Sequence, residues 1–166
     1  MNKQFVIEAV MLAVYGNLLV TKEAVEYIIP SSTISELHDY VNDSTPMMQS
    51  SADEERVRTI IKEMIQYFNM PFHRKQMERS LLAPWSAISI KYSELVQFTI
   101  VKAEDTCMWD DFFDPIETEL ILTAMKREAP LLTDQDEWED RLLEYMIPIQ
   151  FYDIDDFEYA MEQKSV

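Results

Sequence analysis

Acidic side chains at helical spacing are the residues in this sequence with the clearest capacity for chemistry. Two pairs have members three positions apart, and the four carboxylates are Glu23, Glu26, Glu36 and Asp39. Residues at i and i+3 share one face of a helix, so each pair could present two carboxylates to a hard cation such as Mg²⁺. Metal-assisted hydrolysis is therefore one alternative for the function.

The two pairs resemble the acidic helix pairs of all-α nucleotide pyrophosphohydrolases. The resemblance implies a metal-dependent all-α nucleotide hydrolase. The gap of nine residues between Glu26 and Glu36 is short for that family, however, and Pro30 lies within it. With 31 acids in 166 residues such pairs also arise by chance, and solvated helix faces explain them as well.

Other catalytic chemistries have few residues to use. His38 and His73 are the two imidazoles, and neither has a partner at i+4 for a zinc site. Cys107 is flanked by acids, which disfavour its thiolate. The aspartates after Thr133 and after Tyr152 lack the glycine of a calcium loop. The sequence thus favours a protein that is not an enzyme, and we expect no cofactor.

Charge is distributed unevenly along the chain. Residues 1–102 carry 12 acids and 10 bases, whereas residues 103–166 carry 19 acids and 4 bases. The formal net charge of −17 is therefore concentrated in an acidic half. It disfavours direct binding to nucleic acid or to an anionic membrane, because phosphates would be repelled.

Aromatic residues recur among these acids and suggest a binding surface. Large aromatic anchors within complementary charge are typical of protein interfaces. We therefore predict a non-catalytic regulator, inhibitor or adaptor that docks a basic protein, for instance a nucleic-acid-binding protein. The predicted contact residues are Trp109, Asp110, Asp111, Phe112, Asp114, Trp138, Asp153, Asp155, Asp156 and Glu158.

A basic segment precedes the acidic half. Residues 56–79 contain six Lys or Arg and two Glu, a local charge of +4. We expect the acidic half to neutralise this segment, either within one chain or between chains. A self-associating structural protein, and hence a homo-oligomer, is a third alternative for the function.

The composition predicts an all-α protein. Gly16 is the only glycine, so glycine-dependent turns and hairpins have little material. We expect one domain, 1–166, of seven or eight short helices, with helix in more than half of the residues. The expected helices are 3–15, a short one from Thr21 to Pro30, 33–41, 52–68, 71–82, 115–127, 134–147 and 153–162. Capping patterns support several of them, with caps expected at Thr33, Ser51, Asp114 and Thr133.

Residues 86–102 are ambiguous between a helix and a hairpin. Apolar residues alternate there as in strands, but the segment has no glycine for a turn, so a helix is favoured. Any strand should lie within this segment.

The expected location is the cytoplasm. Cys107 has no partner for an intramolecular disulfide, which fits a reducing compartment. The apolar run from Phe5 to Val20 is interrupted by Glu8 and is shorter than the ~20 residues of a spanning helix. We therefore expect a buried helix there rather than a signal peptide or a membrane span.

Overall fold

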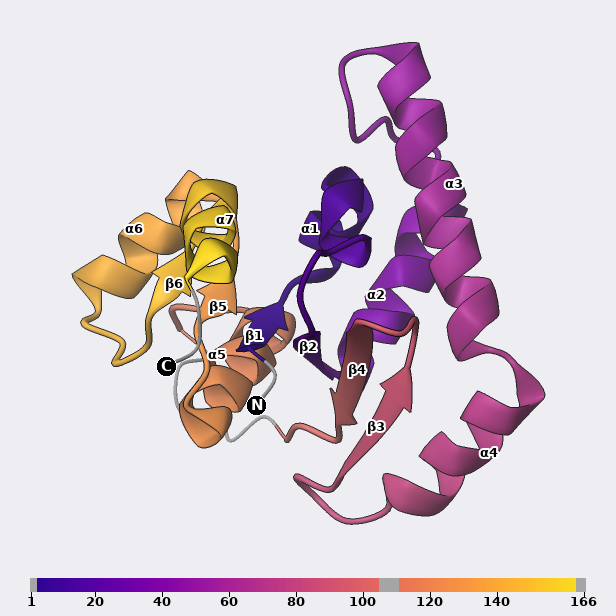
Figure 1. The fold of residues 1–166 in the computed structure, drawn as a ribbon. Coiled ribbons are helices and arrows are strands. Elements are labelled where there is room, and N and C mark those ends of the chain that lie inside the picture. The colour runs from indigo at the N-terminus through magenta and orange to yellow at the C-terminus, as the bar shows by residue number, and fades with distance from the viewer. Residues whose placement is uncertain (1–2, 105–110, 164–166) are drawn as a thin grey trace.

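A six-stranded, mostly parallel β-sheet is the centre of the fold (Figure 1). The computed structural model describes residues 3–104 and 111–163. The strands are β1 (Lys3–Ile7), β2 (Val25–Pro30), β3 (Ala87–Lys91), β4 (Val96–Val101), β5 (Leu131–Leu132) and β6 (Phe151–Tyr152). The helices are α1 (Ala9–Val14), the 3-10 helix η1 (Gly16–Leu19), α2 (Ser31–Asn42), α3 (Ser51–Phe68), α4 (Pro71–Ser80), α5 (Pro115–Arg127), α6 (Asp136–Glu144) and α7 (Ile154–Glu162).

The predicted all-α bundle is wrong. Helix does account for 52% of the structure, but 17% is strand, and four of the six strands lie outside residues 86–102. Central parallel strands are buried on both faces, so they form continuous apolar runs that also suit a buried helix. The runs 5–7 and 27–29 are of this kind.

The scarcity of glycine did not exclude a sheet. Parallel strands are joined by helices rather than by tight turns. Where the backbone does adopt positive φ, the described part of the chain uses Trp85, Glu128 and Met146. Glu128, at φ 50°, ends α5 in the left-handed conformation that glycine usually provides.

The hairpin alternative for residues 86–102 is confirmed, and the favoured helix is wrong. β3 and β4 pair antiparallel. Tyr92 N donates to Val96 O at 2.9 Å, and Ser93 Oγ accepts from Val96 N at 3.1 Å. A serine side chain thus closes the turn that lacks glycine.

Helices with clear caps agree best with the sequence. α5 has the predicted bounds and a capping box between Asp114 and Glu117, and α7 has one between Asp153 and Asp156. α3 is capped by Ser50 rather than Ser51. α2 has no side-chain cap.

The remaining expected helices differ in extent or type. The segment 3–15 divides into β1 and α1, and the short helix expected before Pro30 is β2. The predicted helix 134–147 shortens to α6, with no cap at Thr133, and the predicted helix 71–82 shortens to α4.

The strand order is β3-β4-β2-β1-β5-β6. β1 pairs in parallel with β2 on one side and with β5 on the other. From β1 the chain crosses to β2 on one side, whereas from β5 it crosses to β6 on the opposite side of the sheet order. The carboxyl ends of β1 and β5 therefore form a topological switch point, where open α/β sheets bind ligands.

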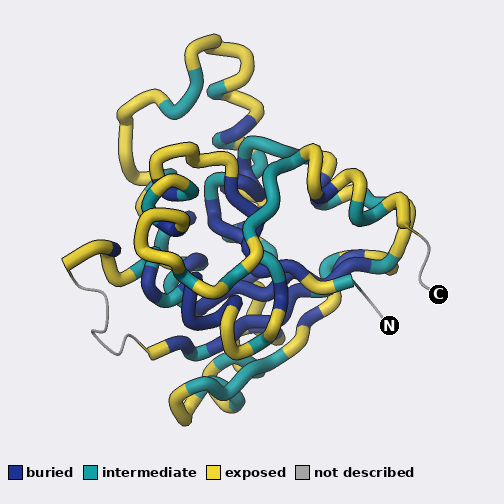
Figure 2. The backbone as a smooth tube through the Cα atoms, turned by 90° about the vertical axis from the view of Figure 1, so that its left-hand side faces the viewer, coloured by how far each residue is buried: buried dark blue, intermediate teal, exposed yellow. Residues whose placement is uncertain are grey.

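Each face of the sheet has its own apolar core. On one face Phe5 and Ile7 of β1 join side chains from α1, α3 and α7. On the other face Val6 joins side chains from α5 and α6. Figure 2 shows the buried segments concentrated in the middle of the molecule.

No helix in the described part of the chain is long and apolar enough to cross a membrane.

The aromatic cluster around Phe98 should carry much of the stability. Phe98 is fully buried, and its ring lies 5.4 Å from that of Phe68 and 5.9 Å from that of Tyr27. We expect Phe98→Ala to lower the free energy of unfolding by about 3–5 kcal/mol, because it leaves a cavity. Urea denaturation measures the loss. Tyr159→Ala, at a residue 66% exposed, should change it by less than about 0.5 kcal/mol, and equal losses would contradict this packing.

Candidate functional site

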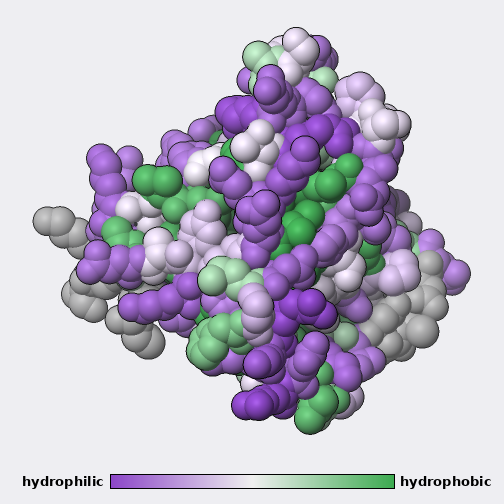
Figure 3. Space-filling model, turned by 90° about the vertical axis from the view of Figure 1, so that its right-hand side faces the viewer, coloured by the Kyte–Doolittle hydropathy of each residue, from purple (hydrophilic) through white to green (hydrophobic). Residues whose placement is uncertain are grey.

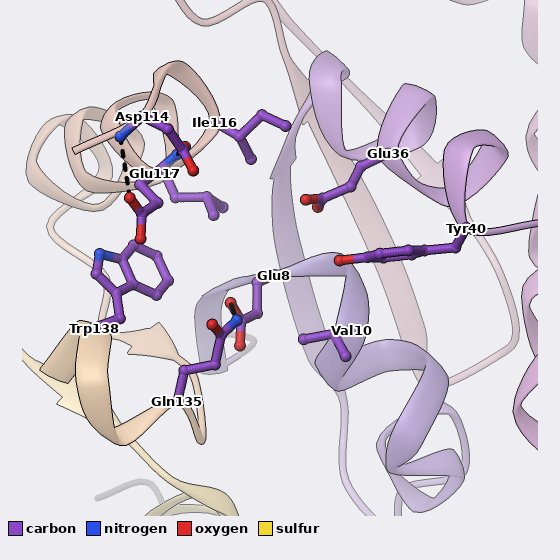
Figure 4. A pocket seen from close by; sticks show the side chains of 10 residues that line it. Glu8, Val10, Glu36, Tyr40, Asp114, Ile116, Glu117, Gln135 and Trp138 are labelled. Atoms are coloured by element: carbon purple, nitrogen blue, oxygen red, sulfur yellow. Dashed lines mark hydrogen bonds between the residues drawn. The ribbon is translucent and has the colours of Figure 1, made fainter. Parts of the chain in front are cut away.

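A pocket lies at the switch point, beside the carboxyl ends of β1 and β5. Its volume is about 170 Å³. The lining side chains come from four parts of the chain and are Glu8, Val10, Glu36, Tyr40, Asp114, Ile116, Glu117, Leu120, Gln135 and Trp138. Figure 4 shows Glu36 and Tyr40 pointing into the pocket from α2, across from Asp114 and Glu8. Four carboxyl groups therefore share one small cavity.

Glu8 is the most buried of these carboxyls. It follows β1 directly and is only 4% exposed. Thr133 Oγ1 donates to its Oε1 at 2.9 Å, and Gln135 Nε2 donates to its Oε2 at 2.8 Å. Burial raises the pKa of Glu8 to about 8; the charges of Asp134 and Glu36 also raise it, and the two hydrogen bonds oppose the shift. Glu8 is therefore mostly protonated at neutral pH.

Glu36 is the second perturbed carboxyl. Burial raises its pKa to about 7, and the charge of Asp114 contributes, whereas a hydrogen bond with Tyr40 opposes the shift. Tyr40 lies one turn further along α2, and burial raises the pKa of its hydroxyl too. Two carboxyls in one pocket whose pKa values are raised to near neutral pH are typical of functional sites.

The amino end of α5 contributes the other two carboxylates. Glu117 N donates to Asp114 Oδ1 at 2.7 Å, and Asp114 N donates to Glu117 Oε1 at 3.0 Å. Arg141 on α6 holds Glu117 with two further hydrogen bonds, the shorter 2.6 Å from Nη2 to Oε2. Both oxygens of the Glu117 carboxylate are thus held by hydrogen bonds, whereas Asp114 accepts the capping hydrogen bond at Oδ1 and is exposed at the pocket.

The side chains of the pocket suit a hydrated cation better than a closed metal cage. Within residues 3–104 and 111–163, no three Asp, Glu, His or Cys side chains converge to form a metal site. Mg²⁺ does not require such a cage, because it keeps several waters and binds one or two carboxylates together with a substrate phosphate. Glu8, Glu36 and Asp114 are the groups that could hold it in this way.

The four carboxylates first predicted for a metal do not come together. Glu36 lines the pocket. Glu23 forms an ion pair with Lys3 at 3.4 Å, and Glu26, in β2, accepts a hydrogen bond from Gln97. Asp39 is exposed on α2. Glu23 and Glu26 do not share a helix, because Glu23 precedes β2 and Glu26 lies within it.

The residues predicted to bind a partner are dispersed. Trp109 and Asp110 lie outside the described residues. Trp138 is 1% exposed, packs in the core under α5 and lines the pocket, so it is not a surface anchor.

The other predicted contact residues lie at two places. Asp111, Phe112 and Asp114 precede α5 and are exposed. Asp153 and Asp156 cap α7, where Asp155 and Glu158 are exposed.

Sequence reasoning missed Glu8 and Gln135. Glu8 comes directly after the short apolar run 5–7, and Gln135 comes three residues after the run 131–132. Polar residues in such positions are the available signal for the carboxyl end of a buried parallel strand. In the sequence, Glu8 is noticeable only as a charge that interrupts an apolar run. The pairing of β1 with β5 that joins them is non-local.

Comparison with known proteins leaves the geometry as the basis for assigning function. The sequence matches no protein-family model and no curated protein.

Stability should depend on pH through Glu8. Its folded-state pKa is raised from 4.5 to about 8. The contribution of protonated Glu8 to the free energy of unfolding is therefore fully present below about pH 4.5 and is lost as pH rises through about 8. Between those values we expect Glu8 alone to account for a loss on the order of 5 kcal/mol, which Glu8→Gln removes, whereas the smaller loss through Glu36, whose pKa is raised to about 7, remains. Urea denaturation across this pH range measures it.

Glu23→Gln, at an ion-paired carboxylate outside the pocket, should leave the pH dependence as in the wild type. If the free energy of unfolding changed with pH in the same way for the wild type and Glu8→Gln, the prediction would be wrong, because Glu8 would then have the same pKa in the folded and unfolded protein.

Proposed function

We propose that this protein is a divalent-cation-dependent hydrolase of phosphate esters, with its active site in the acidic pocket. The observation that carries the proposal is the pair Glu8 and Glu36, two carboxyls with raised pKa that line one cavity at the switch point of the sheet. A cation would replace their protons and remove the repulsion between their charged forms.

The reaction that fits these groups is attack of water on phosphorus. Glu8 and Glu36 would bind the cation, which would also contact the phosphate and lower the pKa of a bound water. Asp114, at the exposed side of the pocket, would accept the proton of that water. The hydroxide would form a bond to phosphorus as the ester P–O bond breaks, and the leaving oxygen would take a proton from solvent.

The net charge bears on the substrate. At −17 the protein repels phosphates unless a cation intervenes, so we propose a small phosphate ester rather than a long polyanion. The amino end of α5, which borders the pocket, favours an anionic group through its dipole. A cytoplasmic location is part of the proposal, since Cys107 is the only cysteine.

Docking of a basic protein stays a second candidate function. The observation that favours it is an exposed aromatic pair, Phe112 and Tyr145, whose ring centroids lie 4.2 Å apart. Asp111 and Asp114 flank Phe112 and are also exposed, which is the predicted combination of anchor and charge.

Calorimetric titration with Mn²⁺ and Mg²⁺ tests cation binding. We expect one site whose affinity rises with pH, because the cation displaces protons. Glu8→Gln and Glu36→Gln should each weaken binding at least about tenfold, or ~1.4 kcal/mol. The matched control is Glu23→Gln, at an ion-paired carboxylate outside the pocket, and it should bind as the wild type does.

Hydrolysis is tested separately with bis(p-nitrophenyl) phosphate and p-nitrophenyl phosphate. Activity should require Mn²⁺ or Mg²⁺ and should fall at least about a hundredfold in Asp114→Asn, as expected on loss of a group that takes up a proton in the reaction. Cation binding without hydrolysis of either ester would overturn the enzymatic assignment. Equal cation binding by Glu8→Gln and the wild type would overturn the site.

A further inference from the structure

Two helices at opposite ends of the molecule expose apolar side chains among charges of opposite sign. α4 lies at the right of Figure 1 and α6 at the left, with the sheet between them. Figure 3 looks onto the side of α3 and α4 and shows apolar side chains among hydrophilic ones.

The exposed face of α4 is basic. Phe72, Lys75 and Arg79 follow one another at i, i+3 and i+7 on one face of α4, and the exposed Leu82 comes two residues after the helix ends; these four residues are called the basic stripe. Phe72 is 65% exposed and Leu82 72%. Lys75 and Arg79 are exposed, and no ion pair among the described residues includes either of them. The expected neutralisation within the chain is thus not observed for this stripe.

α4 is held firmly on its inner side. His73 is buried, its Nδ1 lies 2.6 Å from Tyr67 O, and the two rings are 4.5 Å apart. Lys102 Nζ donates to Leu82 O at 2.9 Å. The basic stripe is therefore presented by a fixed helix, which reduces the ordering cost of binding.

The exposed face of α6 is acidic. Trp138 and Leu142 point into the core, so Asp136, Asp140 and Glu144 lie outward at i, i+4 and i+8. Leu143 beside them is 63% exposed. This acidic stripe, defined as Asp136, Asp140, Leu143 and Glu144, has the apolar and charged character that complements α4.

We propose that the basic stripe of α4 binds the acidic stripe of α6 on a second copy of this chain. Within one molecule the two helices lie on opposite sides of the sheet (Figure 1), so a single copy cannot pair them. Between copies, Lys75 and Arg79 at the middle of the basic stripe face Asp140 and Glu144, and the exposed side chains of Phe72, Leu82 and Leu143 add apolar contact area beside these charges. The proposal does not depend on the proposed hydrolase activity.

The contact joins different surfaces of the two copies. Such a heterologous interface leaves one stripe free at each end of a dimer, so assembly continues until a ring closes or a filament forms. Because the charged groups lie near solvent, salt should weaken the contact: the Debye length falls from more than ~10 Å below about 0.1 M to ~3 Å at about 1 M.

Light scattering after size-exclusion chromatography tests the proposal across protein concentration and salt. We expect the wild type to form species of at least twice the monomer mass at low salt and to dissociate at about 1 M salt. Lys75→Gln/Arg79→Gln and Asp140→Asn/Glu144→Gln should each reduce the mass to that of a monomer. Lys62→Gln and Glu158→Gln, at exposed charges outside both stripes, are the matched controls and should assemble as the wild type does.

Mixing the two double variants is the decisive experiment. Each retains one intact stripe, so the mixture should form a 1:1 heterodimer that grows no further. Circular dichroism of each variant checks that it is folded. A wild-type monomer at every salt and protein concentration would overturn the proposal, and so would a mixture that stays monomeric. Tight binding of an oligonucleotide by a monomeric wild type, lost in Lys75→Gln/Arg79→Gln, would assign α4 to a polyanion instead and would also overturn it.

Discussion

Burial of the Glu8 carboxyl at the end of the central strand is the constraint on which the proposed site depends. An isolated charge there is costly, so Glu8 keeps its proton to about pH 8 even with hydrogen bonds from Thr133 and Gln135. Those two donors follow β5, so the carboxyl is stabilised only where β5 lies beside β1. A cation bound between Glu8 and Glu36 would instead stabilise the two carboxyls in their charged form.

The parallel sheet explains why residues far apart in sequence meet at this place. Strands β1, β2, β4 and β5 run in the same direction, so the segments that follow them emerge at one edge. Glu8 follows β1, α2 follows β2, α5 follows β4 and α6 follows β5. Each segment contributes side chains to the pocket, and the core on each face of the sheet fixes the helices that carry them.

What the sequence could predict follows from how local each pattern is. The boundaries of α5 and α7 depend on a capping box within four residues, and the apolar face of α3 repeats within one helix. The identity of β1 and β2 depends on burial by distant helices, because a short apolar run suits a buried strand and a buried helix equally. Glycine content misled the fold assignment, since the crossovers need no glycine and Ser93 closes the hairpin turn. For the same reason only Glu36 of the predicted metal ligands, and Asp114 and Trp138 of the predicted partner contacts, line the pocket.

The most direct test of the central claim is a carbon-13 NMR titration of the Glu8 side-chain carboxyl. The resonance can be assigned by comparison with Glu8→Gln and followed from about pH 4 to about pH 10, with and without Mg²⁺. We expect a midpoint near 8 in the absence of the cation and a lower midpoint in saturating Mg²⁺, because the cation favours the charged form. A midpoint near the ordinary value of 4.5, or one that Mg²⁺ does not move, would contradict the account.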